Sequence, residues 1–315
     1  MKRVVVLGGG TGNSAIMKGL KNFPIDLTTI VSVCDNGSST GKLREEINMP
    51  AVGDIRKIIL ALSEDNPLKD ILNYRIDSKG ELNNHSIGNI LLTGIYQNND
   101  NNLYEATNVL RSLFNIKSKI LPLSEDNLTL IAKTKDNNII IGEAQITDNN
   151  EEKKSVYYNK NATVLEEVIT ALKEADLIVI APGSLWTSIL PVLICEDIKN
   201  ILKTTKAKIM YICNIMTQPG ETIDYTAGDH VKTINKHIGA NVIDSIIVNN
   251  QVIDDNILKT YKRQEDKDLV KLDYDELTKL NLNIIEDKLI DLSDGTLKHN
   301  PELLSFLIYS YLIRL

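Results

Sequence analysis

The chain has 315 residues, of which 43% are hydrophobic and 24% are charged, and its formal net charge is −7. This is the composition of a globular protein, and it excludes a disordered or fibrous chain. The negative charge provides no basic field that would recruit nucleic acid or an anionic membrane surface. Three scattered cysteines, Cys34, Cys195 and Cys213, indicate reduced thiols, so we expect a cytoplasmic protein.

A strand–helix–strand unit is expected at the start of the chain. Residues 2–7 form a β-branched run that ends in glycines, which is typical of a buried parallel strand. Helical spacing follows over 13–21, and a second buried strand is expected over 27–33. This order predicts an α/β protein with a mostly parallel sheet.

The next segment predicts three helices and then a change of character. The expected helices span 54–62, 86–96 and 103–113, and Asp54 and Ser86 are candidate N-caps. Short apolar segments separated by Asp-Asn turns then predict a β-rich insertion around 116–148.

Strands and helices alternate again over 163–248, followed by a more charged extension over 255–315 that closes with an amphipathic helix. The stretch 177–195 carries no formal charge, but Pro182 and Pro191 interrupt it. We therefore expect a strand, a loop and a helix there, and no membrane span. The whole of 1–315 is expected to form a single α/β domain.

A glycine-rich segment, GGGTGNS, lies between the first strand and the first helix. Glycines allow backbone N–H groups to approach a phosphate, and a helix N-terminus adds partial positive charge. The dinucleotide fingerprint fails at Asn13, and residues 37–42 are one residue short of a Walker A loop. We expect a nucleotide-phosphate loop of another type, with a tight structural turn as the alternative. The candidate ligand-binding residues are Gly9, Gly10, Thr11, Gly12 and Asn13.

Polar residues also follow the second strand. An acid at Asp35, some twenty residues past the glycines, is positioned to hold a ribose hydroxyl or a magnesium ion with phosphate oxygens. A surface turn is the alternative. Asp54 and Arg56 could bind a ligand; alternatively, Asp54 could cap its helix and Arg56 could face solvent. A lone histidine such as His85 is more often structural than catalytic. The candidates from this part are Asp35, Asn36, Ser38, Ser39, Asp54, Arg56, His85 and Asn89.

Two later strand ends carry small hydroxyl residues and turn residues. Ligands of open α/β sheets bind at the carboxyl ends of strands, so the loops 181–188 and 214–222 are candidate phosphate, sugar or base contacts. The single tryptophan, Trp186, could cover a base or a sugar; a plain strand–helix loop is the alternative. The candidates are Pro182, Gly183, Ser184, Trp186, Thr187, Ser188, Asn214, Thr217, Gln218, Gly220, Glu221 and Thr222.

Several catalytic motifs are absent from the sequence. It contains no G-x-S-x-G elbow, no H-E-x-x-H and no C-x-x-C, and its four histidines have no zinc spacing. Nucleophilic and zinc chemistry are therefore not expected.

Taken together and in order, GGGTGNS, DNGSSTGKLR, PAVGDIR, HSIGN, APGSLWTSILP and NIMTQPGET resemble the YvcK/CofD-like family, and within it the gluconeogenesis factor branch. The resemblance implies a Rossmann-like three-layer fold with helices on both faces of the sheet, and a ligand that contains a nucleotide. One branch of this family comprises 2-phospho-L-lactate transferases. The branch resembled here comprises cytoplasmic proteins that bind UDP-sugars, notably UDP-N-acetylglucosamine, and that support cell shape and envelope synthesis on gluconeogenic carbon.

The sequence departs from the family pattern in three places. Asp35-Asn36 replaces the usual Asp-Asp, which would weaken a metal site if that pair holds one. Trp186 replaces a tyrosine, and the segment 298–301 reads Lys-His-Asn-Pro where relatives have Arg-His-Asp-Thr. Lysine lacks the bidentate contact that arginine makes with a pyrophosphate.

Three functions remain open at this point. The favoured one is a nucleotide-sugar sensor that needs no cofactor, with phosphates on 9–12 and 183–188 and the nucleoside near 214–222, Tyr261 or Lys298. It would act as a dimer on an envelope-synthesis or metabolic partner, and 255–315 would complete its ligand site. The alternative is a transferase with Asp35, Asp54 and His85 as magnesium ligands or general base. An NAD-dependent enzyme is disfavoured by the broken glycine fingerprint.

Overall fold

A seven-stranded parallel sheet forms the centre of the computed structural model, which describes residues 1–293 and 295–315. The strand order is β10-β9-β8-β7-β1-β2-β3, and every pair is parallel. The strands are β1 (Arg3–Gly8), β2 (Asp26–Val31), β3 (Lys119–Pro122), β7 (Leu177–Ile180), β8 (Lys208–Ile212), β9 (Ser245–Asn249) and β10 (Asn283–Asp287). The predicted α/β class with a mostly parallel, Rossmann-like sheet is confirmed.

Helices cover both faces of this sheet because both faces of its strands are apolar. In β1, Val4 and Val6 join one core cluster, whereas Val5 and Leu7 join the other. The first cluster is covered by α1 (Thr11–Leu20), α3 (Gly53–Leu62), α5 (Ile87–Asn98), α6 (Leu103–Leu113) and α14 (Pro301–Leu312). The second is covered by α8 (Glu166–Glu174), the short π-helix η1 (Leu185–Ile189), α9 (Leu190–Leu193), α10 (Glu196–Thr204) and α11 (Ala227–Ile238).

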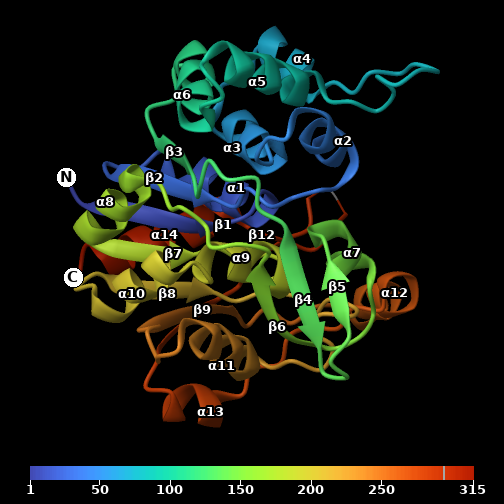
Figure 1. The fold of residues 1–315 in the computed structure, drawn as a ribbon. Helices are drawn as coiled ribbons and strands as arrows, with labels where there is room; N and C mark the ends of the chain where they lie inside the picture. The colour runs from blue at the N-terminus through green and yellow to red at the C-terminus, as the bar shows by residue number, and fades with distance from the viewer. Residues whose placement is uncertain (294) are drawn as a thin grey trace.

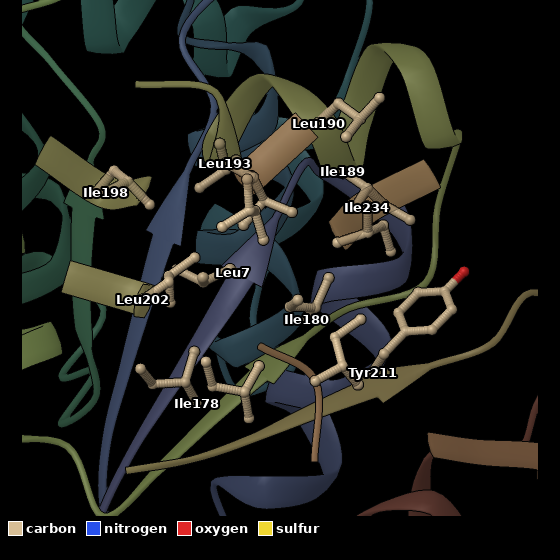
Figure 2. Close-up of a cluster of buried hydrophobic side chains, with 14 of the residues drawn as sticks. Leu7, Ile178, Ile180, Ile189, Leu190, Leu193, Ile198, Leu202, Tyr211 and Ile234 are labelled. Carbon is tan, nitrogen blue, oxygen red and sulfur yellow. The ribbon is translucent and has the colours of Figure 1, made fainter. Parts of the chain in front are cut away.

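The second core cluster joins the sheet to the helices that follow β7. Figure 2 shows Leu7, Ile178 and Ile180 from the strands close to Leu190 and Leu193 from α9. These five side chains are fully buried. This packing fixes the loop after β7 in relation to the loop after β1, because η1 and α9 are anchored directly on the sheet.

A separate three-stranded antiparallel sheet, in the order β5-β4-β6, forms the insertion. Its elements are β4 (Leu130–Thr134), β5 (Ile139–Ile141), α7 (Glu143–Asp148) and β6 (Lys153–Tyr158). Figure 1 shows it to one side of the main sheet, opposite the two chain ends. The expected bounds of 116–148 are wrong at both ends, because β3 belongs to the main sheet and β6 lies beyond residue 148. The left-handed backbone of Gly142 (φ +102°) ends β5, and helix α7 follows within the segment that was expected to be β-rich.

The C-terminal extension completes the main sheet and adds several short elements. β10 pairs with β9, and α14 lies on α1 with Ser305 against Gly19. The remaining elements are α2 (Ser38–Ile47), α4 (Pro67–Asn73), α12 (Asp255–Glu265), α13 (Tyr274–Lys279), β11 (Ile290–Asp291) and β12 (Lys298–His299). Within 1–293 and 295–315, the structure contains no helix with the length and hydropathy needed to cross a membrane.

Two of the expected caps differ from the structure. Val52 is the N-cap of α3, and Asp54 lies in the first helical turn. Ser86 does occupy the N-cap of α5, but its hydroxyl donates to the Leu72 carbonyl at 3.3 Å instead of capping the helix. Asp54 is thus available to face the carboxyl edge of the sheet.

Candidate functional site

A cavity of about 650 Å³ lies at the carboxyl ends of the central strands. The chain reverses direction across the sheet here, since β2 and β3 lie on one side of β1 and β7 to β10 on the other. Open α/β sheets bind ligands at such a switch point. The predicted residues that line the cavity are Gly9, Gly10, Thr11, Gly12, Asp35, Asp54, Pro182, Gly183, Ser184, Thr187, Ser188, Asn214, Thr217, Gln218, Tyr261 and Lys298.

The glycine loop brings the N-terminus of α1 to the cavity. The first intrahelical hydrogen bond runs from the Ser14 amide to the Gly10 carbonyl at 2.9 Å, so the amides before Ser14 precede the helical ladder. A Cβ on Gly12 would lie 2.7 Å from the carbonyl carbon of Pro182, and one on Gly9 would lie 3.0 Å from Cβ of Ser188. The loops after β1 and β7 therefore pack backbone to backbone, and side chains at these glycines would separate them.

Three carboxylates and one ammonium line the cavity beside the glycine loop. Asp35 follows β2 and accepts a hydrogen bond from the Gly37 amide at 2.8 Å. Burial, followed by repulsion from Asp54, raises the pKa of Asp35. Burial, followed by the charges of Asp35 and Asp54, raises the pKa of Glu143 to about 7. Lys57 forms an ion pair with Asp54 at 2.9 Å. These charges give the cavity wall the means to bind hydroxyl groups or a cation, and to move a proton near neutral pH.

The hydroxyl of Ser184 is occupied by its own neighbours. It donates to Oε2 of Glu221 at 2.5 Å and accepts from the Thr187 amide at 3.1 Å, and it lies 2.6 Å from the Thr187 hydroxyl. The loop after β7 therefore presents backbone groups and Ser188 to a ligand. Trp186 is buried, and its indole N–H donates to the Glu221 carbonyl at 3.0 Å. It packs in the core and does not line the cavity, contrary to the expectation that it covers a base or sugar.

The loop after β8 contributes its first half to the cavity. The Asn214 side chain accepts from the Gly183 amide at 3.0 Å and donates to the Gly183 carbonyl at 2.7 Å, which joins two strand-end loops. Thr217 is fixed by its hydroxyl, which accepts from the Asp268 amide at 3.0 Å. The second half of the loop turns inward and does not line the cavity: its members are Gly220, Glu221 and Thr222.

Glu221 is held in the interior next to a buried lysine. Lys153 of β6 donates to the Gly220 carbonyl at 2.7 Å and also to the Asn149 carbonyl. Burial raises the pKa of Glu221, and the hydrogen bond from Ser184 and the charge of Lys153 oppose this rise. This arrangement positions the loop and ties it to the insertion, so Glu221 supports the cavity from outside.

Another group of predicted residues lies behind α2 and does not reach the cavity. His85 contacts the Ser39 hydroxyl at 3.1 Å, and Asn89 donates to the same hydroxyl at 3.3 Å. Arg56 is buried and donates to Asn73 at 3.3 Å. The polar residues that follow Asp35 begin helix α2, and neither Ser39 nor His85 lines the cavity. The predicted role of His85 as a magnesium ligand or general base thus has no cavity contact to support it.

Asn13, Asn36 and Ser38 are also outside the cavity lining. Asn13 is buried and donates to the Thr29 hydroxyl at 2.7 Å, so it joins α1 to β2. Asn36 donates to Gln145 at 3.0 Å and accepts from the Ala144 amide at 2.8 Å. It holds the insertion helix α7, so the replacement of an aspartate here does not remove a carboxylate from the cavity wall.

The C-terminal segment closes the cavity on the side of the nucleoside-binding candidates. Tyr261 and Lys298 line it, together with Lys267 and His299, which the sequence analysis did not select. The Tyr261 hydroxyl accepts from the Leu297 amide at 2.7 Å. Burial lowers the pKa of His299 to about 4, so its neutral imidazole donates from Nε2 to the Cys213 carbonyl at 3.1 Å at neutral pH.

The sequence matches the family described as CofD, 2-phospho-L-lactate transferase, over residues 4–290. The chain belongs to the CofD family. It is 37% identical to the gluconeogenesis factor of Bacillus subtilis (strain 168) over 312 residues, which cover 98% of this chain and 98% of that protein. It is also 37% identical to the gluconeogenesis factor of Halalkalibacterium halodurans over 306 residues, 96% of this chain and 94% of that one.

A solved structure has the same fold as this CofD family member. The crystal structure of a UPF0052 family protein from Bacillus halodurans superposes with a TM-score of 0.94 at 37% identity. The match covers 98% of this chain and 99% of that chain. The similarity therefore extends across the insertion and the C-terminal segment that border the cavity.

Besides Lys267 and His299, the cavity residues of this CofD family member that sequence reasoning missed include Lys57, Glu143, Thr147 and Asp291. Lys57 follows Asp54 by three positions on α3, so a helix-face argument could have found it. Glu143 and Thr147 lie on α7, in the segment that the sequence predicted to be β-rich. Within the part of the chain that the structure describes, no group of three His, Cys, Asp or Glu residues has the arrangement of a metal site.

Proposed function

We propose that this CofD family member binds a nucleotide sugar of the UDP-N-acetylglucosamine type in the cavity, and that it acts as a regulator. The observation that carries the proposal is the joining of three strand-end loops around one 650 Å³ space. Pockets for small ligands occupy about 300–1,000 Å³. The glycine loop offers backbone donors for phosphates, and the segment 214–218 with Tyr261 offers polar and aromatic contacts for a nucleoside.

The regulatory part of the proposal rests on how the cavity is assembled. Its wall combines the sheet edge, the insertion helix α7 and the C-terminal segment, so a bound ligand would contact all three. A ligand shifts a conformational equilibrium when it binds one arrangement more tightly than another. We propose that such a shift is transmitted to an envelope-synthesis or metabolic protein in the cytoplasm, in support of cell shape on gluconeogenic carbon. The relatives named gluconeogenesis factor are consistent with this context.

A second candidate is a transferase that uses a nucleotide-activated donor. Asp35, Asp54 and Glu143 line the same cavity, and carboxylates can bind magnesium or accept a proton. The matching family is described as 2-phospho-L-lactate transferase. Since no three acidic residues of the described chain are arranged as a metal site, a magnesium ion would take one or two of these carboxylates as ligands and the rest from phosphate oxygens and water.

Calorimetry with UDP-N-acetylglucosamine, GDP and NAD, each with and without magnesium, separates these candidates. Saturable binding of the uridine sugar without metal, and with no product detected by phosphorus NMR, supports the sensor. Preference for GDP with magnesium overturns it in favour of the transferase. Asp35→Asn should leave the uridine-sugar affinity within a few-fold in the sensor, whereas a large, magnesium-dependent loss indicates the transferase. Size-exclusion chromatography tests the proposed dimer.

A further inference from the structure

Lys57 lies over the start of α1, at the end of the cavity formed by the glycine loop. A Cβ on Gly10 would lie 2.6 Å from Cδ of Lys57, so the lysine stem lies directly against that glycine. Its Nζ is 2.9 Å from Oδ1 of Asp54, and 43% of its side chain is exposed. The ammonium is therefore fixed next to the helix N-terminus while it stays open to the cavity.

The charges around this ammonium are mostly of the opposite sign. Asp35 from the loop after β2, Asp54 from α3 and Glu143 from α7 line the same cavity, and each of them would repel a phosphate when it is ionised. Lys267 and Lys298 also line the cavity, but they come from the C-terminal segment together with Tyr261. The glycine-loop end therefore needs a local cation before it can hold an anionic group.

Lys57 can serve this role without leaving Asp54. An ammonium has three N–H donors, and the hydrogen bond to Asp54 uses one of them. The other two can be directed to phosphate oxygens. Burial lowers the pKa of Lys57, but the charge and hydrogen bond of Asp54 together with the charge of Asp35 outweigh burial and raise it, which keeps the ammonium charged.

We propose that Lys57 is the residue that admits a diphosphate to the glycine-loop end of the cavity, and so selects diphosphate ligands over uncharged nucleosides. This inference rests on the proposed nucleotide-sugar function. A competing explanation is that Lys57 only stabilises the first turn of α3 through its pairing with Asp54, as exposed helical pairs do.

The test compares Lys57→Gln with the wild-type protein in titrations with UDP and with uridine. A hydrogen bond to a charged group contributes enough that its loss should weaken UDP binding about tenfold or more. Uridine affinity, measured by ligand-observed NMR, should be unchanged, and Lys57→Arg should retain most of the UDP affinity. Lys18→Gln is the matched control, because Lys18 is exposed on α1 and does not line the cavity. It removes the same charge and should leave both affinities unchanged.

The outcomes are distinguishable. If Lys57→Gln binds UDP as tightly as the wild type, the role of Lys57 is refuted and the proposed function stands. If the variant loses UDP and uridine affinity in equal proportion, Lys57 supports the fold of the site and does not select phosphate. If the wild-type protein binds neither UDP nor UDP-N-acetylglucosamine, the proposed function and this inference both fail. Circular dichroism of each variant confirms that a loss of binding does not come from unfolding.

Discussion

The Asn214 side chain joins the loops after β7 and β8, and its removal should both destabilise the protein and weaken ligand binding. In Asn214→Ala, the Gly183 amide loses an acceptor at 3.0 Å and the Gly183 carbonyl loses a donor at 2.7 Å. Each such hydrogen bond contributes about 1 kcal/mol, and an unsatisfied buried group costs about 1–3 kcal/mol. Gly183 is half-buried, so water can replace part of what is lost. We therefore expect the free energy of unfolding to fall by about 1–3 kcal/mol.

Urea denaturation followed by circular dichroism measures this change, and calorimetry with UDP-N-acetylglucosamine measures the effect on the site. The exposed Asn22 provides a matched control, since Asn22→Ala makes the same chemical change away from the cavity and should alter stability by less than about 0.5 kcal/mol. The reasoning would be refuted if Asn214→Ala changed stability no more than Asn22→Ala and bound the nucleotide sugar with wild-type affinity. The two hydrogen bonds would then have no role in holding the loops together.

Three further predictions concern the cavity wall. Gly10→Val should leave a folded protein without nucleotide affinity, because a Cβ at Gly10 meets flexible side chains. Gly12→Ala should instead lower the melting temperature, because a Cβ at Gly12 meets the Pro182 backbone. Equal melting temperatures of the two variants would contradict this reasoning. The pKa of Glu143 is raised from 4.5 to about 7, so this group lowers the stability of the folded state progressively as the pH rises from about 4.5 to 7. Glu143→Gln should therefore be more stable than the wild type at pH 8, but not at pH 4. The pKa of His299 is lowered to about 4, so its protonation favours the unfolded state as the pH falls from about 6.5 to 4; His299→Gln should reduce this loss, and identical pH profiles would disprove the assignment.

The sheet and the glycine loop could be predicted from the sequence because their signals are local. The run 2–7 is apolar on both faces, and the glycines follow it directly, so strand, turn and helix can be recognised without knowledge of distant residues. The parallel arrangement then places the loops after different strands at one edge. The position of the cavity follows from these features alone.

The start of α2 could not be predicted because distant contacts decide it. Its serines, threonine and glycine look like a loop, but Arg44 is buried later in the same helix. The Arg44 guanidinium donates to the carbonyls of Cys34 and Asp35 at 2.9 Å each and to the Leu128 carbonyl at 2.5 Å. These bonds fix the helix against the end of β2 and against the chain before β4. The sequence around Arg44 does not indicate a partner such as Leu128, which lies more than eighty residues away.

The contribution of α7 was hidden for a similar reason. Glu143 reaches the cavity because Gly142 turns the chain and Asn36 holds the Ala144 amide. Both conditions depend on the docking of the insertion, which the sequence does not specify. Trp186 was predicted to cover a ligand, but the structure places it in the interior. A large apolar ring with an indole N–H is as well suited to a buried, hydrogen-bonded position as to a ligand contact.

The docking of Asn36 on α7 has a consequence for the comparison of relatives. An aspartate at this position could still accept the Ala144 amide, but it would lack the amide donor that Asn36 offers to Gln145. Substitutions at position 36 should therefore be accompanied by substitutions at position 145. Such a pair of substitutions indicates how the insertion is attached. Positions 35, 54 and 143 are the ones to compare when binding proteins are sorted from transferases.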